Sequence, residues 1–235
     1  MNTPFNFRLT KFPNEAELLR HEVRDFLSEA LKDIPKETRA ETWYGADENF
    51  SKKVGQKGWI GLNWPKEHGG AGRSAMERYV ILEEMLTAGA PVGAHWISDR
   101  QSGPLIIRYG TEKHQKELLP GILKGESYFC IGMSEPDSGS DLAALRTKAE
   151  KKDDIYLVNG TKLWTSGAHR CQYMIALFKT SQEEDRHGGF SQFIVDLSLP
   201  GVTIRPIIDL AGRHHFNEVI FEDVEVPFEN VLGEE

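Results

Sequence analysis

The sequence predicts an α+β multidomain protein in which an all-α helical N-terminal domain is followed by a small antiparallel β-barrel domain. Two observations support this fold class. Apolar residues in the first half recur at helical spacing, whereas short β-rich runs separated by turns take over after about residue 128. We place the boundary near residue 126, so that the helical domain covers residues 1–126 and the β domain covers residues 127–235.

The first predicted helix begins at Asn14, which together with Glu17 has the pattern of a capping box. Pro35 closes the segment because proline cannot continue a helix. The apolar residues that form one stripe on this helix are Leu19, Val23, Phe26, Leu27 and Ala30.

Two more helices are predicted before residue 126. Ser74-Ala-Met-Glu77 is a second capping box, and the helix that it opens ends at Gly89 and Pro91. A shorter helix over residues 111–119 stops at Pro120. Residues 62–72 have no period of their own and are predicted to be a loop between helices.

The second half reads as short strands. Residues 155–158 and 161–165 predict a β-hairpin, because the Asn159-Gly160 pair between them suits a type I′ turn. The other strand candidates are residues 173–180, 190–197, 202–206 and 218–222. Many short strands at close spacing indicate a small antiparallel barrel or sandwich.

The composition limits the class of protein. A net charge of −8 and a pI near 5.6 argue against bulk nucleic-acid binding. No apolar run approaches the roughly 18 residues that a membrane helix needs, and the N-terminus has no apolar core of signal-peptide length. Cys130 and Cys171 form no disulfide framework and have no metal-ligand spacing. We therefore expect a soluble cytoplasmic protein without a bound metal.

The stretch Ile131-Gly-Met-Ser-Glu-Pro-Asp-Ser-Gly-Ser-Asp-Leu142 is the first candidate for a binding site. Its Ser, Gly and Ser residues allow successive backbone N–H groups to converge in a nest that binds a phosphate or a polarised carbonyl. A multi-turn connector is the alternative. The sequence has no GxGxxG and no Walker motif, so it is neither a Rossmann nor a P-loop protein by motif.

The stretch Asn159-Gly-Thr-Lys-Leu-Trp-Thr-Ser-Gly-Ala168 is the second candidate. It places Trp164 beside the hydroxyls of Thr165 and Ser166, and an indole beside hydroxyl groups can flank and hydrogen-bond a flat heteroaromatic ring. A core tryptophan on a strand is the alternative.

Three motifs in order, SEPDSGSDL, NGTKLWTSGA and GRHHFNEVIFEDVEVP, resemble the acyl-CoA dehydrogenase family in spacing and residue type. The N-terminal half agrees, with GLNWPKEHGGAG, an acidic helix at Leu82-Glu-Glu84, and YGTEKHQKELLPGILKGE. The resemblance covers nearly the whole chain from about residue 14.

The resemblance implies an FAD enzyme that desaturates an acyl-CoA between its α and β carbons. In the family a carboxylate takes the α proton, and the β hydrogen leaves as hydride to flavin N5. The resemblance also implies electron-transfer flavoprotein as the electron acceptor and a homo- or hetero-oligomeric enzyme.

The same resemblance assigns the first stretch to one side of a flavin site. The residues matched to the flavin ring and ribityl chain are Ile131, Gly132, Met133 and Ser134. Ser134 stands where the family usually has a Thr or Ser that hydrogen-bonds the ring. Gly139 and Ser140 match the turn at the flavin diphosphate, and Ser140 also matches a contact to the pantetheine arm of CoA. Asp137 and Ser138 depart from the common Gly-Ala pair of this loop.

The second stretch matches the segment that covers the ring, through Trp164, Thr165 and Ser166. Ser166 stands where a Thr commonly donates near flavin N5. Because Ser keeps the hydroxyl of Thr, the hydrogen bond is expected to survive this exchange.

The C-terminal helical domain of the family, which usually brings the catalytic base, has no counterpart in the sequence. We therefore assign no catalytic residue and interpret Glu234 and Glu235 as solvated turn carboxylates. Little or no turnover is expected from the chain in isolation. The alternatives are a flavin oxidase or monooxygenase relative of the same fold, and a non-catalytic flavin-binding subunit of a split enzyme. The variants around Trp164 and His214 resemble the branch that handles dicarboxylic, aromatic-chain or steroid side-chain CoA esters.

Other conspicuous residues receive structural interpretations. His214 and His215 are adjacent and cannot share one face of a strand, so we interpret them as a surface or interface pair and not as metal ligands. Cys130 is interpreted as a small core residue. The remaining tryptophans, interpreted as packing residues, are Trp43, Trp59, Trp64 and Trp96.

Overall fold

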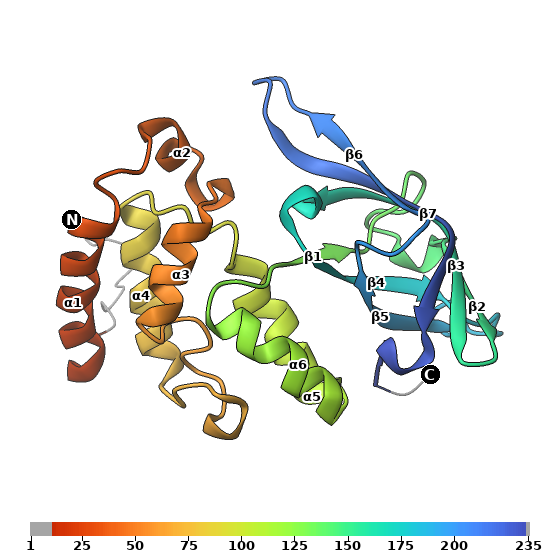
Figure 1. Cartoon of the computed structure of the whole chain (residues 1–235), viewed down its shortest axis with the longest axis horizontal. Coiled ribbons are helices and arrows are strands. Elements are labelled where there is room, and N and C mark those ends of the chain that lie inside the picture. The colour runs from red at the N-terminus through yellow and green to blue at the C-terminus, as the bar shows by residue number, and fades with distance from the viewer. Residues whose placement is uncertain (1–10, 234–235) are drawn as a thin grey trace, which may run out of the picture.

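The computed structural model, which describes residues 11–233, confirms the predicted fold class. Helices fill the N-terminal part and strands the C-terminal part, and the two parts lie side by side along the long axis of the molecule (Figure 1). Among the described residues, no helix combines the length and the apolar character needed to cross a membrane.

The helical part begins with a long helix that packs lengthwise on α4. The α-helices are α1 (Asn14–Ala30), α2 (Lys36–Ala40), α3 (Glu48–Gln56), α4 (Ala75–Thr87), α5 (Gly103–Tyr109) and α6 (Glu112–Leu123). A π-helical turn, Ser98–Ser102, leads into α5, and a 3₁₀ turn, Thr42–Tyr44, precedes α3.

The helix ends test the capping patterns. The predicted box at the start of α4 is confirmed, with reciprocal hydrogen bonds between Ser74 and Glu77. The box predicted at Asn14 is wrong, because α1 begins directly after Pro13 without a side-chain cap. The stop predicted at Pro120 is also wrong. Pro120 lies inside α6 one turn before its end, where few backbone bonds are lost and the buried apolar face of the helix continues.

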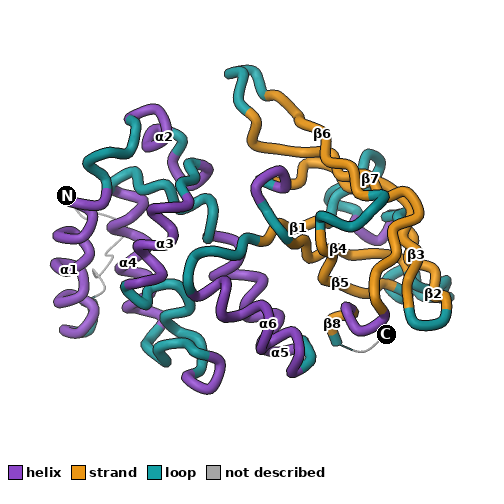
Figure 2. Tube along the Cα trace, viewed as in Figure 1, coloured by secondary structure: helices purple, strands orange, loops and turns teal. Residues whose placement is uncertain are grey.

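The β part is one twisted sheet of eight strands. The strands are β1 (Phe129–Gly132), β2 (Lys148–Lys152), β3 (Ile155–Ser166), β4 (Tyr173–Lys179), β5 (Phe190–Asp196), β6 (Val202–Ile208), β7 (His214–Pro227) and β8 (Val231–Leu232). Their order is β6-β7-β3-β2-β4-β5-β8, with β1 beside β4. Most pairs are antiparallel as predicted, but the sheet is not closed as a barrel, and β4 pairs in parallel with both β1 and β2. The β6–β7 hairpin projects beyond the rest of the sheet (Figure 2).

The hairpin predicted at Asn159-Gly160 is wrong. β3 continues through both residues, and its pairing with β7 shifts register between Val158 and Gly160. Gly160 has a φ of 143°, and a Cβ there would lie 2.7 Å from the Cα of Thr147, so the site requires glycine. The Asn-Gly pair therefore marks a β-bulge and a close approach of two backbones.

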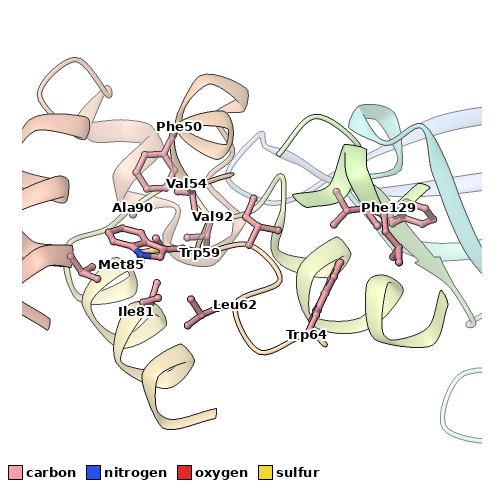
Figure 3. Close-up of a cluster of buried hydrophobic side chains, with 14 of the residues drawn as sticks. Phe50, Val54, Trp59, Leu62, Trp64, Ile81, Met85, Ala90, Val92 and Phe129 are labelled. Atoms are coloured by element: carbon pink, nitrogen blue, oxygen red, sulfur yellow. The ribbon is translucent and has the colours of Figure 1, made fainter. Parts of the chain in front are cut away.

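The apolar core is continuous across the two parts. One cluster of buried side chains fills the helical part and reaches the sheet at Phe129 (Figure 3). Ile175 and Ile194 on the sheet belong to the same cluster. A second cluster, centred on Tyr156, Phe178 and Phe193, lies within the sheet part. The first cluster holds the end of β1 in a fixed position, and the first candidate stretch starts there.

Candidate functional site

The two stretches singled out from the sequence lie against each other. The backbone N–H of Leu163 donates to the carbonyl oxygen of Ser134 at 2.8 Å. The Nζ of Lys162 donates to the carbonyl oxygen of Met133 at 3.2 Å. The loop over residues 133–141, here called the 133–141 loop, is therefore attached to the last third of β3.

A buried ion pair completes this attachment. The Nζ of Lys162 lies 2.8 Å from Oε1 of Glu135, and the two residues are 0% and 7% exposed. The same carboxylate accepts hydrogen bonds from the backbone N–H groups of Arg146 at 2.6 Å and Thr147 at 3.0 Å. Glu135 thus joins the start of the 133–141 loop, the chain leading into β2, and β3.

The ion pair shifts the pKa values of both groups. Burial alone would raise the pKa of Glu135, but the hydrogen bonds from Lys162, Thr147 and Arg146 outweigh burial and hold it below its usual value. Burial lowers the pKa of Lys162, and Glu135 opposes that change. The carboxylate of Glu135 therefore accepts hydrogen bonds from three protein donors, which replace the hydration that it loses on burial.

Trp164 is presented to solvent by a β-bulge. The pairing of β3 with β7 shifts register between Lys162 and Thr165, and Trp164 within this bulge has a φ of 61°. Such a conformation is rare for a bulky residue and costs roughly 1–3 kcal/mol. The indole remains 57% exposed, with its edge contact to Phe216 at 6.0 Å between ring centroids. A strained, exposed aromatic wall is typical of a binding site.

The residues after Trp164 differ in exposure. Thr165 is 1% exposed, and within the described part of the chain its buried Oγ1 has no hydrogen-bond partner. Its carbonyl oxygen accepts from the side-chain amide of Asn217 at 3.0 Å. Ser166 is partly exposed and lines a cleft at the junction of the helices and the sheet.

The strand before the loop is closely packed. Ile131 is partly buried and pairs with Ile175 on β4. Gly132 is buried, and a Cβ there would lie 2.4 Å from Sδ of Met174. Met133 and Ser134 are partly exposed, as Ile131 is, so Gly132 is the one predicted site residue of this region that is buried.

The tip of the 133–141 loop is closed by its own hydrogen bonds. The N–H of Glu135 donates to the carbonyl of Ser138 at 2.7 Å, and the Ser138 hydroxyl donates to the carbonyl of Asp141 at 2.9 Å. Gly139 and Ser140 lie at the exposed tip, and a Cβ on Gly139 would meet no atom within 4 Å. Asp137 and Ser138, which depart from the family pattern, take no left-handed conformation.

The cleft at the junction has aromatic walls. From the helical part it is lined by Trp43, Tyr44 and Trp96, and from the sheet part by Ser166, His169, Arg170, His214 and His215, among others. The cleft is narrow, and the space in it that water can occupy is about 50 Å³. Residues from both halves of the sequence therefore meet next to Ser166.

The two adjacent histidines separate as predicted. The ring of His214 stacks on that of His169 at 3.8 Å, whereas His215 contacts the ring of Tyr44 at 4.8 Å. Burial, followed by the charges of His214 and Arg170, lowers the pKa of His169 to about 4. Across residues 11–233, no group of three His, Cys, Asp or Glu side chains is placed to hold a metal ion.

Several structural interpretations are confirmed. Cys130 is fully buried, and burial raises the pKa of its thiol. Trp59 and Trp64 are core residues, but Trp43 is 40% exposed and lines the cleft. Glu84 is buried against the guanidinium groups of Arg20 and Arg24. Glu234 and Glu235 lie outside the described residues.

The sequence-based reasoning missed the two residues that organise the site. Glu135 was passed over as part of a polar loop, and Lys162 as part of a strand. A lysine at an inward position of an alternating strand, with a glutamate in a neighbouring loop, is the pattern that could have identified the pair.

The residues present suit a flat cofactor with an anionic arm. Trp164 offers an exposed ring face, and Ser134 and Ser166 offer partly exposed hydroxyls near it. The Gly139-Ser140 turn leaves its backbone open to a ligand. Fold and site together define a two-part protein in which a helical part and a sheet part meet beside an exposed indole and an open backbone turn.

The family models give this class a name. The model described as acyl-CoA dehydrogenase, N-terminal domain, matches residues 13–126, and that of the acyl-CoA dehydrogenase middle domain matches residues 130–224. The chain belongs to the acyl-CoA dehydrogenase family.

Curated relatives agree with this assignment. Acyl-CoA dehydrogenase IpdE1 of Mycobacterium tuberculosis is 36% identical over 226 residues, which cover 93% of the chain and 59% of that protein. The mitochondrial isovaleryl-CoA dehydrogenase of Pongo abelii is 30% identical over 236 residues and is covered to 56%. The chain therefore spans a little more than half the length of the curated relatives that it matches.

Solved structures show the same arrangement. The chain matches the crystal structure of the ChsE4-ChsE5 complex of Mycobacterium tuberculosis with a TM-score of 0.85 and 34% identity, over 97% of this chain and 58% of that one. The Tcur3481-Tcur3483 steroid ACAD matches with a TM-score of 0.87 and 36% identity. The match covers 95% of this chain and 58% of that one.

Proposed function

We propose that the chain is the flavin-binding portion of an FAD-dependent acyl-CoA dehydrogenase. The observation that carries this proposal is the junction of the two stretches through Glu135, Lys162 and the Leu163–Ser134 hydrogen bond. This junction sets an exposed indole beside a loop with an open backbone. Family membership supplies the cofactor class.

In this proposal the ring of FAD lies against Trp164, with the residues around Met133, Ser134 and Ser166 at its edges. Thr165 contributes through its backbone, because its side chain is buried. Ile131 and Gly132 act as the packed base of the wall. Bound FAD supplies the acceptor for the hydrogen removed from the β carbon of the substrate.

Gly139 and Ser140 hold the diphosphate of FAD in this proposal, and Ser140 also contacts the pantetheine arm of CoA. Both residues lie at the exposed tip of the 133–141 loop, whose shape is fixed by the Glu135–Ser138 and Ser138–Asp141 hydrogen bonds. Backbone N–H groups in a closed turn are suitable donors for an anionic group because they need no reorganisation on binding.

The base that removes the α proton is proposed to come from outside residues 11–233. The conspicuous carboxylates here are already engaged: Glu135 with Lys162, and Glu84 with two arginines. We further propose a domain boundary near residue 126, a cytoplasmic location, electron-transfer flavoprotein as the electron acceptor, and assembly into an oligomer. Two of the matching structures carry paired names, ChsE4-ChsE5 and Tcur3481-Tcur3483, and the second is described as a steroid ACAD, which supports a steroid side-chain or related acyl group.

Titration of the purified chain with FAD tests the proposal. Quenching of flavin fluorescence is expected to saturate at one FAD per chain, and the sample should show a flavin absorbance band after gel filtration. A folded chain that takes up no FAD contradicts the proposal. Rapid peroxide formation after chemical reduction of the flavin would favour the oxidase alternative. FAD binding without acyl-CoA turnover, even after addition of a helical partner chain, would favour the non-catalytic subunit.

A further inference from the structure

A buried amide holds the strand segment that carries the proposed flavin wall. Asn217 on β7 is 0% exposed and pairs with Thr165 on β3. Its Nδ2 donates to the carbonyl oxygen of Thr165 at 3.0 Å, and its Oδ1 lies 2.7 Å from Nε2 of His214. Because the amide oxygen can only accept, Nε2 of His214 carries the proton in this contact. The side chain of Asn217 therefore connects a ring on β7 with the backbone of β3.

The bond to Thr165 is made where β3 departs from regular pairing. The register of β3 on β7 shifts between Lys162 and Thr165, and Trp164 inside this bulge has a φ of 61°. A bulge interrupts the ladder of backbone hydrogen bonds, so the chain beside it needs other contacts to keep one conformation. The side chain of Asn217 supplies such a contact at the residue that separates Trp164 from Ser166.

Packing alone does not explain an amide at this position. Asn217 lies in the inward-facing row of β7, and the next members of that row, Val219 and Phe221, are buried apolar residues. An apolar side chain would lose less hydration on burial at the same place. The two hydrogen bonds of Asn217, to Thr165 and His214, account for the amide.

Two stacked histidines fix the orientation of the amide. An asparagine side chain that rotates by 180° keeps its shape but exchanges its donor and its acceptor. The N–H of His214 selects the arrangement in which Oδ1 faces the imidazole and Nδ2 faces Thr165. The ring of His214 is held against that of His169, with 3.8 Å between ring centroids and 19° between their planes. A continuous set of contacts thus runs from His169, which lines the cleft, to the backbone beside Trp164.

We propose that Asn217 is a positioning residue of the flavin wall. Its hydrogen bond to Thr165 sets the direction of the Trp164 indole and of the Ser166 hydroxyl, and His214 keeps the amide in the orientation that this bond requires. The part of the inference that concerns FAD rests on the proposed function. The part that concerns Trp164 and Ser166 is a property of the chain without cofactor and is measured there.

Hydrogen exchange of the backbone amides at residues 163–166 tests the inference in the chain without FAD. Asn217→Leu keeps the approximate size of the side chain and removes both hydrogen bonds, so exchange at these residues is expected to be about tenfold faster than in the wild type. His214→Leu is expected to cause a smaller increase. His214→Gln, whose amide N–H can replace that of the imidazole, should restore the wild-type rate.

The visible circular dichroism of bound flavin is the second readout. In a chain saturated with FAD these bands depend on how the ring is oriented in its surroundings, which a loss of stability alone does not change. Asn217→Leu is expected to alter the bands and to weaken FAD binding by about tenfold.

Asn230→Leu is the matched control for both readouts. Nδ2 of Asn230 donates to the carbonyl oxygen of Ile194 at 2.9 Å, and its Oδ1 lies 3.4 Å from Nε2 of His114. The chemical arrangement is that of Asn217, but the residues lie outside the flavin wall. Asn230→Leu should therefore leave exchange at residues 163–166 and the flavin bands unchanged.

Wild-type exchange at residues 163–166 in a folded Asn217→Leu chain overturns the inference, and so does an equal acceleration in Asn230→Leu. If Asn217→Leu does not fold, identical exchange in His214→Leu and His214→Gln overturns it. Unchanged flavin bands in FAD-loaded Asn217→Leu overturn the part that concerns the cofactor. A folded wild-type chain that takes up no FAD contradicts the proposed function instead, and the exchange rates without FAD still show whether Asn217 positions residues 163–166.

Discussion

Lys162 and Glu135, which are 27 positions apart in the sequence, form a buried ion pair with 2.8 Å between Nζ and Oε1. Each residue belongs to one of the two stretches that were predicted as opposite parts of a single site. The pair therefore links the 133–141 loop to the end of β3 and sets the shape of the wall between them. The contribution of this ion pair to the stability of the protein can be measured directly.

Lys162→Met is expected to destabilise the protein by about 3–5 kcal/mol, because the carboxylate of Glu135 stays buried without its cation. The loss should shrink at acid pH, where Glu135 becomes protonated. Urea unfolding at several pH values measures both effects. Lys113→Met removes an exposed ion pair with Glu229 and, as the control, should cost less than about 1 kcal/mol. Equal losses in the two variants would show that burial of the pair has no special effect.

Stability is expected to fall as the pH is lowered from about 6.5 to about 4, in part through His95. Burial lowers the pKa of His95 to about 4 in the folded state, and its Nδ1 lies 2.8 Å from the hydroxyl of Ser51. A base whose pKa is lowered by folding takes up its proton in the unfolded state at a higher pH than in the folded state. Its contribution to the free energy of unfolding is therefore complete above the unfolded pKa. That contribution is lost as the pH falls towards the folded pKa. The loss reaches about 3 kcal/mol for this group.

The measurement is the slope of the unfolding free energy against pH, compared between the wild-type chain and His95→Gln. The variant cannot take up the proton, so its slope between pH 6.5 and 4 should be shallower. The carboxylate of Glu135, whose folded pKa is lowered, contributes a separate loss below the usual glutamate pKa in both proteins. An identical slope in the two proteins would contradict the assignment to His95.

Trp164→Gly is expected to leave the apo protein as stable as the wild type or more stable by about 1 kcal/mol, because glycine takes the left-handed conformation without strain. The same change removes the exposed ring and should weaken FAD binding by roughly fivefold or more. Thermal unfolding and FAD titration are the two measurements. Asp153→Gly relieves a φ of 50° in the β2–β3 turn and serves as the control, with a similar effect on stability and none on FAD.

Gly139→Ala is expected to be tolerated by the apo protein, since a Cβ there meets no atom within 4 Å and the residue has no positive φ. Stability should change by less than about 1 kcal/mol. If the diphosphate of FAD approaches this backbone closely, the added methyl group should nevertheless weaken FAD binding. Unchanged FAD affinity in a normally folded Gly139→Ala protein would argue against the diphosphate position.

Most of the fold follows from local patterns that need no tertiary information. The capping box at Ser74 and Glu77 is sufficient to start α4, and β-rich runs bounded by turn residues located β4, β5 and β6 within two residues at each end. The predictions were wrong for elements whose boundaries depend on contacts with distant parts of the chain. Asn159-Gly160 has the composition of a turn, but the approach of Thr147 and pairing with β7 keep it within β3. The short helix α3 was missed because its start depends on one residue, Asp47, whose side chain accepts from the N–H of Phe50.

The site was also predictable only where local sequence patterns define it. The exposed residues of both stretches were recognisable from their motifs, but their support was not, because an isolated Glu or Lys in a sequence is ordinarily a surface residue. The burial of Lys162 and the left-handed conformation of Trp164 arise only when β3 pairs with β7 around a bulge. The aromatic cleft, which joins Trp43 to His169, depends on how the helices pack on the sheet and has no local pattern at all.

Hydrogen exchange of the backbone amides with and without FAD tests most directly the central claim that the two joined stretches form one flavin-binding wall. FAD is expected to slow exchange in the 133–141 loop and at residues 163–166 together, and to leave α1 and α3 unchanged. The same experiment on Lys162→Met should show faster exchange of both segments in the apo protein. Slowed exchange in another part of a folded, FAD-bound chain, with neither stretch affected, would contradict the account.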